Sequence, residues 1–171
     1  GAVKTPDWLL LGGSFRGMLL AVAAGGSPVQ TRAIEMEADL KAQVTVGPVR
    51  ASGTLGYSHE GGLPASITAG TQDNLVSREH WLGVDLADGA VLLRAGRLNL
   101  PFGIRSVEHT LWARSSTRTD INDAQQHGVA VAYSGQLLRG EVMAIAGNFQ
   151  MGPDEFRERG YSGYLEAAVA P

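Results

Sequence analysis

Residues 33–58 read AIEMEADLKAQVTVGPVRASGTLGYS, and this stretch decides the fold. Apolar and polar residues alternate in it with a period of two, which is typical of a β-strand with one apolar face. The alternation breaks once, at Gly47-Pro48, and then resumes in the opposite direction. We therefore predict a β-hairpin around a two-residue turn with glycine in its first central position. The facing pairs are then Val46 and Val49, Leu40 and Leu55, and Ala38 and Tyr57.

The first strand of this hairpin is unusually long. It covers residues 33–46, which is 14 residues, whereas strands of soluble domains usually have about 5 or 6. A tilted strand that crosses a bilayer needs about 9–11 residues. A long hairpin with one apolar and one polar face predicts an antiparallel transmembrane β-barrel.

Two further hairpins follow the same pattern. The first runs from Glu79 to Leu98 around Asp88-Gly89, which is a strong hairpin turn signal. Its expected pairs are Leu86 with Val91, Val84 with Leu93 and Leu82 with Ala95, and Asp85 and Arg94 become diagonal neighbours that are close enough to pair. The second runs from His127 to Ala146 around Gly135-Gln136, with Tyr133 facing Leu138 and Val129 facing Val142.

The connections between the hairpins are long, and those within them are short. Ser58 to Arg78, Asn99 to Gln126 and Asn148 to Arg159 separate the hairpins. Short turns on one side and long loops on the other are typical of outer-membrane barrels and not of sandwiches. Weaker strands at Ser14 to Ala24 and Gly160 to Ala170 bring the expected meander to about eight strands in a single domain, residues 1–171. Ile104 to Arg114 is a candidate for a further strand, so a segment of a larger barrel is an alternative.

Composition excludes several classes of function. The 171 residues carry a formal net charge of -3 and no cluster of basic residues, so nucleic acid is not an expected partner. There is no cysteine, no apolar run long enough for a membrane helix and no HExxH motif. We expect no catalytic residue, no metal and no cofactor. No signal peptide opens the chain, so we expect that one was removed or that the chain is a fragment.

One part of the sequence resembles a known family. Leu93 to Arg105 reads LRAGRLNLPFGIR, and EHTLWAR, GVAVAYSG and LRGEVMAIAGN follow it. Together these are similar to bacterial outer-membrane porins in which a strand ending in Gly-Arg leads to a Pro-Phe-Gly segment. The resemblance implies passive diffusion of small solutes or ions through a water-filled lumen, with no cofactor. Porins of this kind are longer chains, so we expect a partial barrel.

The alternation assigns candidate roles to the polar residues. If the apolar set faces lipid, the other set lines the pore: Glu35, Glu37, Asp39, Lys41, Arg50, Asp85, Arg94, Arg139 and Glu141. Pro101, Phe102 and Gly103 form either a fixed bend or, as the resemblance implies, the start of a loop that constricts the lumen. Five aromatic residues fall near strand ends, where an interfacial girdle would place them: Tyr57, Trp81, Tyr133, Tyr161 and Tyr164.

The sequence leaves three functions open. The first is a porin-like channel of the cell outer membrane in a Gram-negative envelope, whose partners are the lipid bilayer, small solutes or ions and, as a further possibility, other copies of the chain. The second is a soluble all-β protein, a lipocalin-like barrel or a sandwich, that binds an apolar ligand. The third is a structural membrane barrel whose interior is closed by salt bridges.

Overall fold

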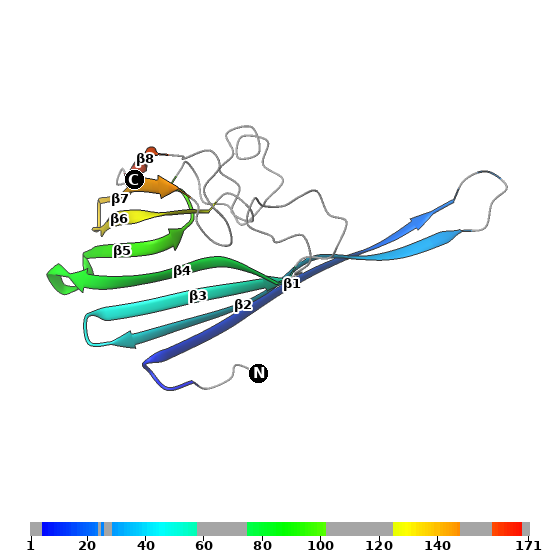
Figure 1. Ribbon diagram of the computed structural model, residues 1–171, viewed down its shortest axis with the longest axis horizontal. Helices are drawn as coiled ribbons and strands as arrows, with labels where there is room; N and C mark the ends of the chain where they lie inside the picture. Colours follow the sequence, from blue (N-terminus) through cyan, green and yellow to red (C-terminus); the bar gives the residue numbers. More distant parts are fainter. Residues whose placement is uncertain are drawn as a thin grey trace.

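The protein forms one antiparallel sheet in which every strand pairs with the next. The computed structural model describes residues 5–23, 25, 29–57, 75–101, 125–147 and 159–168. The strands are β1 (Leu9–Val22), β2 (Gln30–Val46), β3 (Val49–Tyr57), β4 (Leu75–Leu86), β5 (Val91–Leu98), β6 (Gln126–Ser134), β7 (Leu138–Gly147) and β8 (Gly160–Ala167). Their order in the sheet is their order in the chain (Figure 1). The expected all-β meander is confirmed, and within these residues β1 and β8 are opposite edges of an open sheet.

The first two predicted hairpins have the expected register. Ala38 pairs with Tyr57, Leu40 with Leu55 and Val46 with Val49 across β2 and β3. Gly47 has a φ of +56°, which is the left-handed conformation that glycine adopts without steric cost. Across β4 and β5, Leu82 pairs with Ala95, Val84 with Leu93 and Leu86 with Val91. Asp88 and Gly89 are the central residues of their turn, which the short element η1 (Ala87–Gly89) forms.

The register predicted for the third hairpin is wrong by two residues. Tyr133 pairs with Gly140 and not with Leu138, and Val129 pairs with Ala144 and not with Val142. The reason is the turn, because four residues lie between the paired Ser134 and Arg139 where a two-residue turn was expected. A shift of two residues keeps every side chain on its face of the sheet. The prediction of which residues share a face is therefore correct, although the register is wrong.

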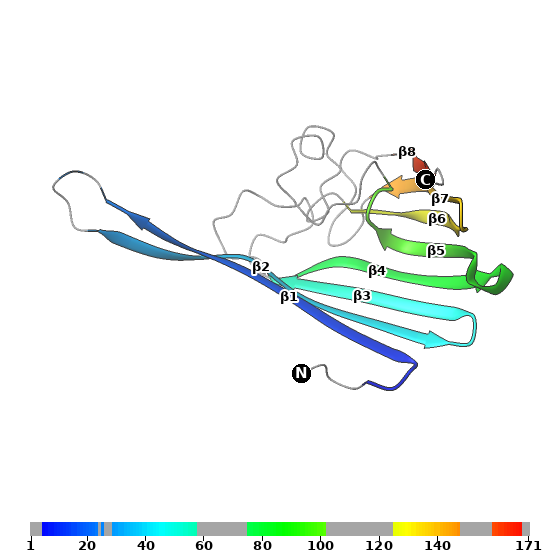
Figure 2. The ribbon, with the colours of Figure 1, turned by 180° about the vertical axis from the view of Figure 1, so that it is seen from behind.

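The edge strands differ in length from the predicted ones. β1 begins at Leu9 and not at Ser14, and β8 ends at Ala167. Beyond a bulge at Arg16 and Gly17, β1 pairs with a part of β2 that β3 does not reach. The two strands continue there as a ribbon that extends past the rest of the sheet (Figures 1 and 2). The candidate strand Ile104 to Arg114 lies outside the described residues.

Short and long connections lie at opposite ends of the sheet. Residues 47–48, 87–90 and 135–137 join strands at the end where β1 begins and β8 finishes (Figure 1). Residues 23–29, 58–74, 99–125 and 148–159 join strands at the other end. The predicted asymmetry of the connections is confirmed.

The two faces of the sheet have opposite character. We call the face that carries Leu40, Leu82 and Val142 the apolar face and the face that carries Lys41, Arg94 and Glu141 the charged face. Leu40 is 63% exposed and Val142 60%, whereas Glu141 is 3% exposed. A soluble protein in water buries its apolar side chains and exposes its charges, so this sheet has the inverse arrangement. No helix among the described residues is long and apolar enough to cross a bilayer.

Candidate functional site

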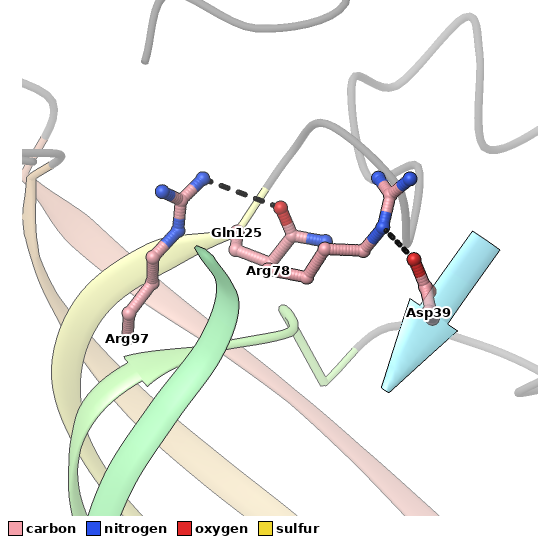
Figure 3. A network of polar contacts seen from close by, with 4 residues as sticks. All are labelled: Asp39, Arg78, Arg97 and Gln125. Carbon is pink, nitrogen blue, oxygen red and sulfur yellow. Dashed lines mark hydrogen bonds and ion pairs between the residues drawn. The ribbon is translucent and has the colours of Figure 1, made fainter. Parts of the chain in front are cut away.

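The charged face holds ion pairs between strands that are not neighbours. The strand between the two partners has a glycine or another small residue where the pair passes over it. Asp39 of β2 and Arg78 of β4 flank β3 at Gly56, and the Arg78 Nε donates to Asp39 Oδ1 at 2.8 Å (Figure 3). A Cβ atom on Gly56 would lie 2.5 Å from that nitrogen and 2.7 Å from that oxygen. Glycine is therefore what allows this ion pair to cross the strand between its members.

A bulge in β4 brings two adjacent charged residues to the same face. The pairing of β3 with β4 shifts between Thr54 and Leu55, where β4 has one extra residue. Arg78 contacts Asp39 there, and Glu79 contacts Lys41 with 4.0 Å between Nζ and Oε2. In regular alternation one of two neighbouring side chains would point to the apolar face. Because of the bulge, neither Arg78 nor Glu79 has to place its charge on the apolar face.

Asp85 and Arg94 have different partners from the predicted ones. The expectation that they pair with each other is wrong, because the Arg50 Nε donates to Asp85 Oδ2 and the Arg94 Nη2 donates to Glu141 Oε1. The facing residues of β4 and β5 are correct, but the long arginine side chains reach other strands. Arg50 extends from β3 to β4, and Arg94 crosses β6 to reach β7.

Among the ion pairs of the described residues, the pair of Arg94 and Glu141 is the most enclosed. The side chain of Arg94 is 13% exposed and that of Glu141 1%. The Arg94 guanidinium also lies 5.3 Å from the centre of the Trp81 ring, which adds a cation–π contact. Trp81 lies opposite Gly96. A side chain is excluded at Gly96, because its φ is +145° and an added Cβ atom would lie 2.2 Å from the His80 carbonyl oxygen. The prediction that Trp81 belongs to an interfacial girdle is wrong, because its side chain is buried on this face.

The other predicted site residues fall into two groups. Arg139 and Glu166 form an ion pair of 3.0 Å near the short turns, where both side chains are more than half exposed. Glu35 and Glu37 have backbones in β2, but their side chains lie outside the described part of the chain. Of the nine pore-lining candidates, the structure thus places the side chains of seven on the charged face.

The segment after β5 lies against the charged face. Leu100 packs on a buried cluster made of Trp81, Leu98, Ala130 and Met143. Pro101 is fully buried, and its carbonyl accepts a 2.8 Å hydrogen bond from the hydroxyl of Ser162 in β8. Pro101, a candidate for either a fixed bend or a constricting loop, thus lies beside β8. Phe102 and Gly103 lie outside the described residues.

Sequence reasoning missed a polar cluster at the end of the sheet with the long connections. Arg97 and Gln125 are both fully buried, with 3.3 Å between the Arg97 Nη2 and Gln125 Oε1 (Figure 3). The rings of His80 and His127 lie nearby, with their centroids 5.4 Å apart. Gln125 precedes β6, and no pattern in the sequence announces its burial. The adjacent charges Arg78-Glu79 were a usable signal, because two neighbouring charges in an alternating strand indicate a bulge.

Several buried polar atoms of the charged face have no hydrogen-bond partner among the residues that the structure describes. They include the hydroxyl oxygens of Ser52 and Thr54 and the second carboxylate oxygen of Asp85. Buried polar groups in native proteins are paired with protein atoms or with water. These three atoms lie on β3 and β4, and the Arg94 Nε on β5 is a further one, so such atoms are spread over the charged face and suit a hydrated environment. Within the described ranges no three metal-ligating side chains gather at one place.

Comparison with known proteins adds no assignment. No protein-family model matches the chain, and a search of curated proteins finds no match. The function has to be argued from the sheet and its two faces.

Proposed function

We propose that the chain forms the wall of a β-barrel channel in the outer membrane of a Gram-negative type envelope. The apolar face contacts lipid, the charged face lines a water-filled lumen, and small hydrophilic solutes or ions diffuse through it. No residue carries out covalent chemistry, and no cofactor takes part.

The observation that carries this proposal is the exposure of the apolar face. Large aliphatic side chains stand out from it on every strand, and they include Leu11, Leu19, Leu40, Leu55, Leu82, Leu93, Val131, Val142 and Leu165, each at least 40% exposed. Soluble monomers rarely expose a continuous apolar surface of more than a few hundred square ångströms. A lipid-facing wall with alternate polar residues turned inward is the arrangement of outer-membrane barrels.

The charged face supports a lumen and not an apolar ligand site. Ion pairs from Asp39, Lys41, Arg50 and Arg94 extend over it, and polar atoms that need water lie between them. A lipocalin-like protein would place Leu, Val and Ala side chains around its ligand. Here those residues are mainly on the opposite face, so the soluble alternative has less support.

A barrel with a lumen also has to pair its free edges. Among the described residues β1 and β8 have one neighbour each, and exposed strand edges pair readily with other strands. In our proposal, these two edges pair with further strands, such as those of other copies of the chain, and so close the wall.

Conductance tests the proposal and separates it from a closed structural barrel. The purified protein is inserted into a planar lipid bilayer, and ionic current is recorded at fixed voltage. A channel gives discrete conductance steps, and a control preparation that was heat-denatured before insertion gives none. Insertion without any current would reject the channel and leave the structural barrel.

A further inference from the structure

The two edge strands of the sheet run in opposite directions. β1 begins at Leu9 and β8 ends at Ala167, and both of these residues lie at the end of the sheet with the short turns (Figure 1). The eight described strands alternate in direction, because each is antiparallel to the next. Strand β8 of one sheet can therefore extend β1 of another sheet as one more antiparallel pair. In a bilayer such pairing is required, since every backbone N–H and C=O group in the hydrocarbon needs a partner.

Both edges keep the division into an apolar and a charged face. On β1, Gly12 pairs with Lys41 and belongs to the charged face. On β8, Glu166 pairs with Arg139 and belongs to the same face. In β8, and in β1 as far as its bulge, the even-numbered residues are therefore those of the charged face. Joining the two edges keeps each face whole only when even-numbered residues oppose even-numbered ones, so the register can change only in steps of two.

Large apolar side chains stand on the apolar face of both edge strands. Phe15 on β1 is 73% exposed, and Tyr161 and Leu165 on β8 are 85% and 73% exposed. Phe15 pairs with Ala38 and Tyr161 with Ala144, so each aromatic ring has a small residue at the paired position of its own sheet. Joining β8 to β1 of a second copy would place these side chains on one continuous face, where aromatic and aliphatic cross-strand pairs stabilise a sheet. The two edges thus match in direction and in the character of both faces.

Only one way of joining two copies keeps their orientation in a membrane. The apolar faces have to contact lipid on the outside, and the short turns of both copies have to lie on the same side of the bilayer. Pairing β1 with β1 of a second copy violates one of these conditions, because it reverses either the faces or the ends of one sheet. Pairing β8 with β8 does the same. Pairing β8 with β1 preserves both orientations, and a head-to-tail contact of this kind generates a ring when it closes.

We infer that two copies of the chain close one barrel through two identical β8–β1 junctions, and that the charged faces of both copies line its lumen. The inference rests on the proposed channel function and adds to it the second copy without which the lumen is incomplete. Two copies of the eight-stranded sheet give 16 strands, and barrels of 16–18 strands hold an aqueous channel. A barrel of eight strands is only wide enough for its interior side chains to fill, and here these include the long side chains of Arg50 and Arg94.

Disulfide formation tests this inference, because the chain contains no cysteine and each variant carries a single thiol. One chain carries Glu166→Cys on β8, and a second carries Gly12→Cys on β1, where an added Cβ atom meets no other atom within 4 Å. Leu10→Cys and Ser14→Cys test the neighbouring registers, and Leu11→Cys on the apolar face is the matched control. The two chains are mixed in urea, folded into liposomes, oxidised and separated on a non-reducing gel. Heat-modifiable migration confirms that each variant is folded.

We expect the mixture to give a band at twice the mass of one chain with at least one of the three charged-face positions of β1. The band should be absent with Leu11→Cys and with either chain alone. A chain that carries both cysteines should give covalent dimers and no larger products. Larger products, or an internal disulfide without dimers, would overturn the ring of two copies. The absence of dimers at all three positions, or an equal yield with Leu11→Cys, would overturn the β8–β1 junction.

Conductance of the cysteine-free chain separates this result from a failure of the proposed function. Discrete current steps without any cross-link would overturn the inference, leave the channel intact and assign its closure to other strands. Cross-linked dimers without current steps would reject the channel, and the β8–β1 junction would then close a structural barrel.

Discussion

At the scale of single residues, glycine decides where charges meet across a strand. Gly56 leaves room for the contact between Arg78 and Asp39, and an added methyl group would displace both side chains. We predict that Gly56→Ala destabilises the protein by about 1–3 kcal/mol, because two mostly buried charged groups lose their hydrogen bond. Urea unfolding of the liposome-inserted protein measures the effect.

Gly53→Ala is the matched control for this substitution. It lies on the same strand, but the nearest atom to its added Cβ, the Glu79 carbonyl oxygen, is 4.0 Å away. Both variants replace a glycine of β3 by alanine, but only Gly56→Ala disturbs the ion pair of Arg78 and Asp39. Equal unfolding midpoints would contradict a role of the ion pair in stability.

Burial also decides how much a single ion pair contributes. We predict that Glu141→Ala costs about 3–5 kcal/mol, because Arg94 is left as an enclosed charge without its carboxylate. Glu166→Ala should cost less than about 1 kcal/mol, because its pair with Arg139 is in water. The same urea titration compares them. A Glu166→Ala variant as unstable as Glu141→Ala would show that enclosure does not set the difference.

At the scale of strands, the apolar face makes a prediction that separates lipid from water. Leu82 is 58% exposed in the middle of β4, and Leu137 is 66% exposed in the turn between β6 and β7. In a bilayer, Leu82→Arg should cost about 2–4 kcal/mol, because the charge enters the hydrocarbon. Leu137→Arg should be tolerated at the membrane surface.

The measurement is the fraction of each variant that folds into liposomes, read from heat-modifiable migration on a gel. In a soluble protein both substitutions would replace one exposed leucine by an arginine and change stability by about 0.5 kcal/mol or less. Equal folding of the two variants would therefore contradict the lipid-facing assignment of β4.

The strands also show what alternation can and cannot predict. The period of two assigned side chains to faces correctly even in β6 and β7, where the register was wrong. The register depends on the length of the turn. Gly47-Pro48 and Asp88-Gly89 predict the position of their turns correctly, whereas Gly135-Gln136 does not. The bulge at Arg78 and the reach of Arg94 to Glu141 depend on three-dimensional neighbours. Faces could therefore be read from the sequence, but the partners of the charges could not.

At the scale of the whole molecule, the inverse arrangement of the faces predicts which solvent keeps the protein folded. Its buried apolar cluster has four residues among those the structure describes, and large apolar side chains are exposed along the entire sheet. Such a sheet is not stabilised by hydrophobic burial in water. This agrees with our proposal that lipid, or detergent in its place, covers the apolar face.

The most direct test is to compare the purified protein in plain aqueous buffer with a matched sample in detergent micelles. Far-UV circular dichroism reports the β-structure, and size-exclusion chromatography reports whether the particles are monodisperse. We expect a β spectrum and a single particle size with detergent, and aggregated or unfolded protein without it. A compact β monomer in plain buffer would contradict the membrane assignment.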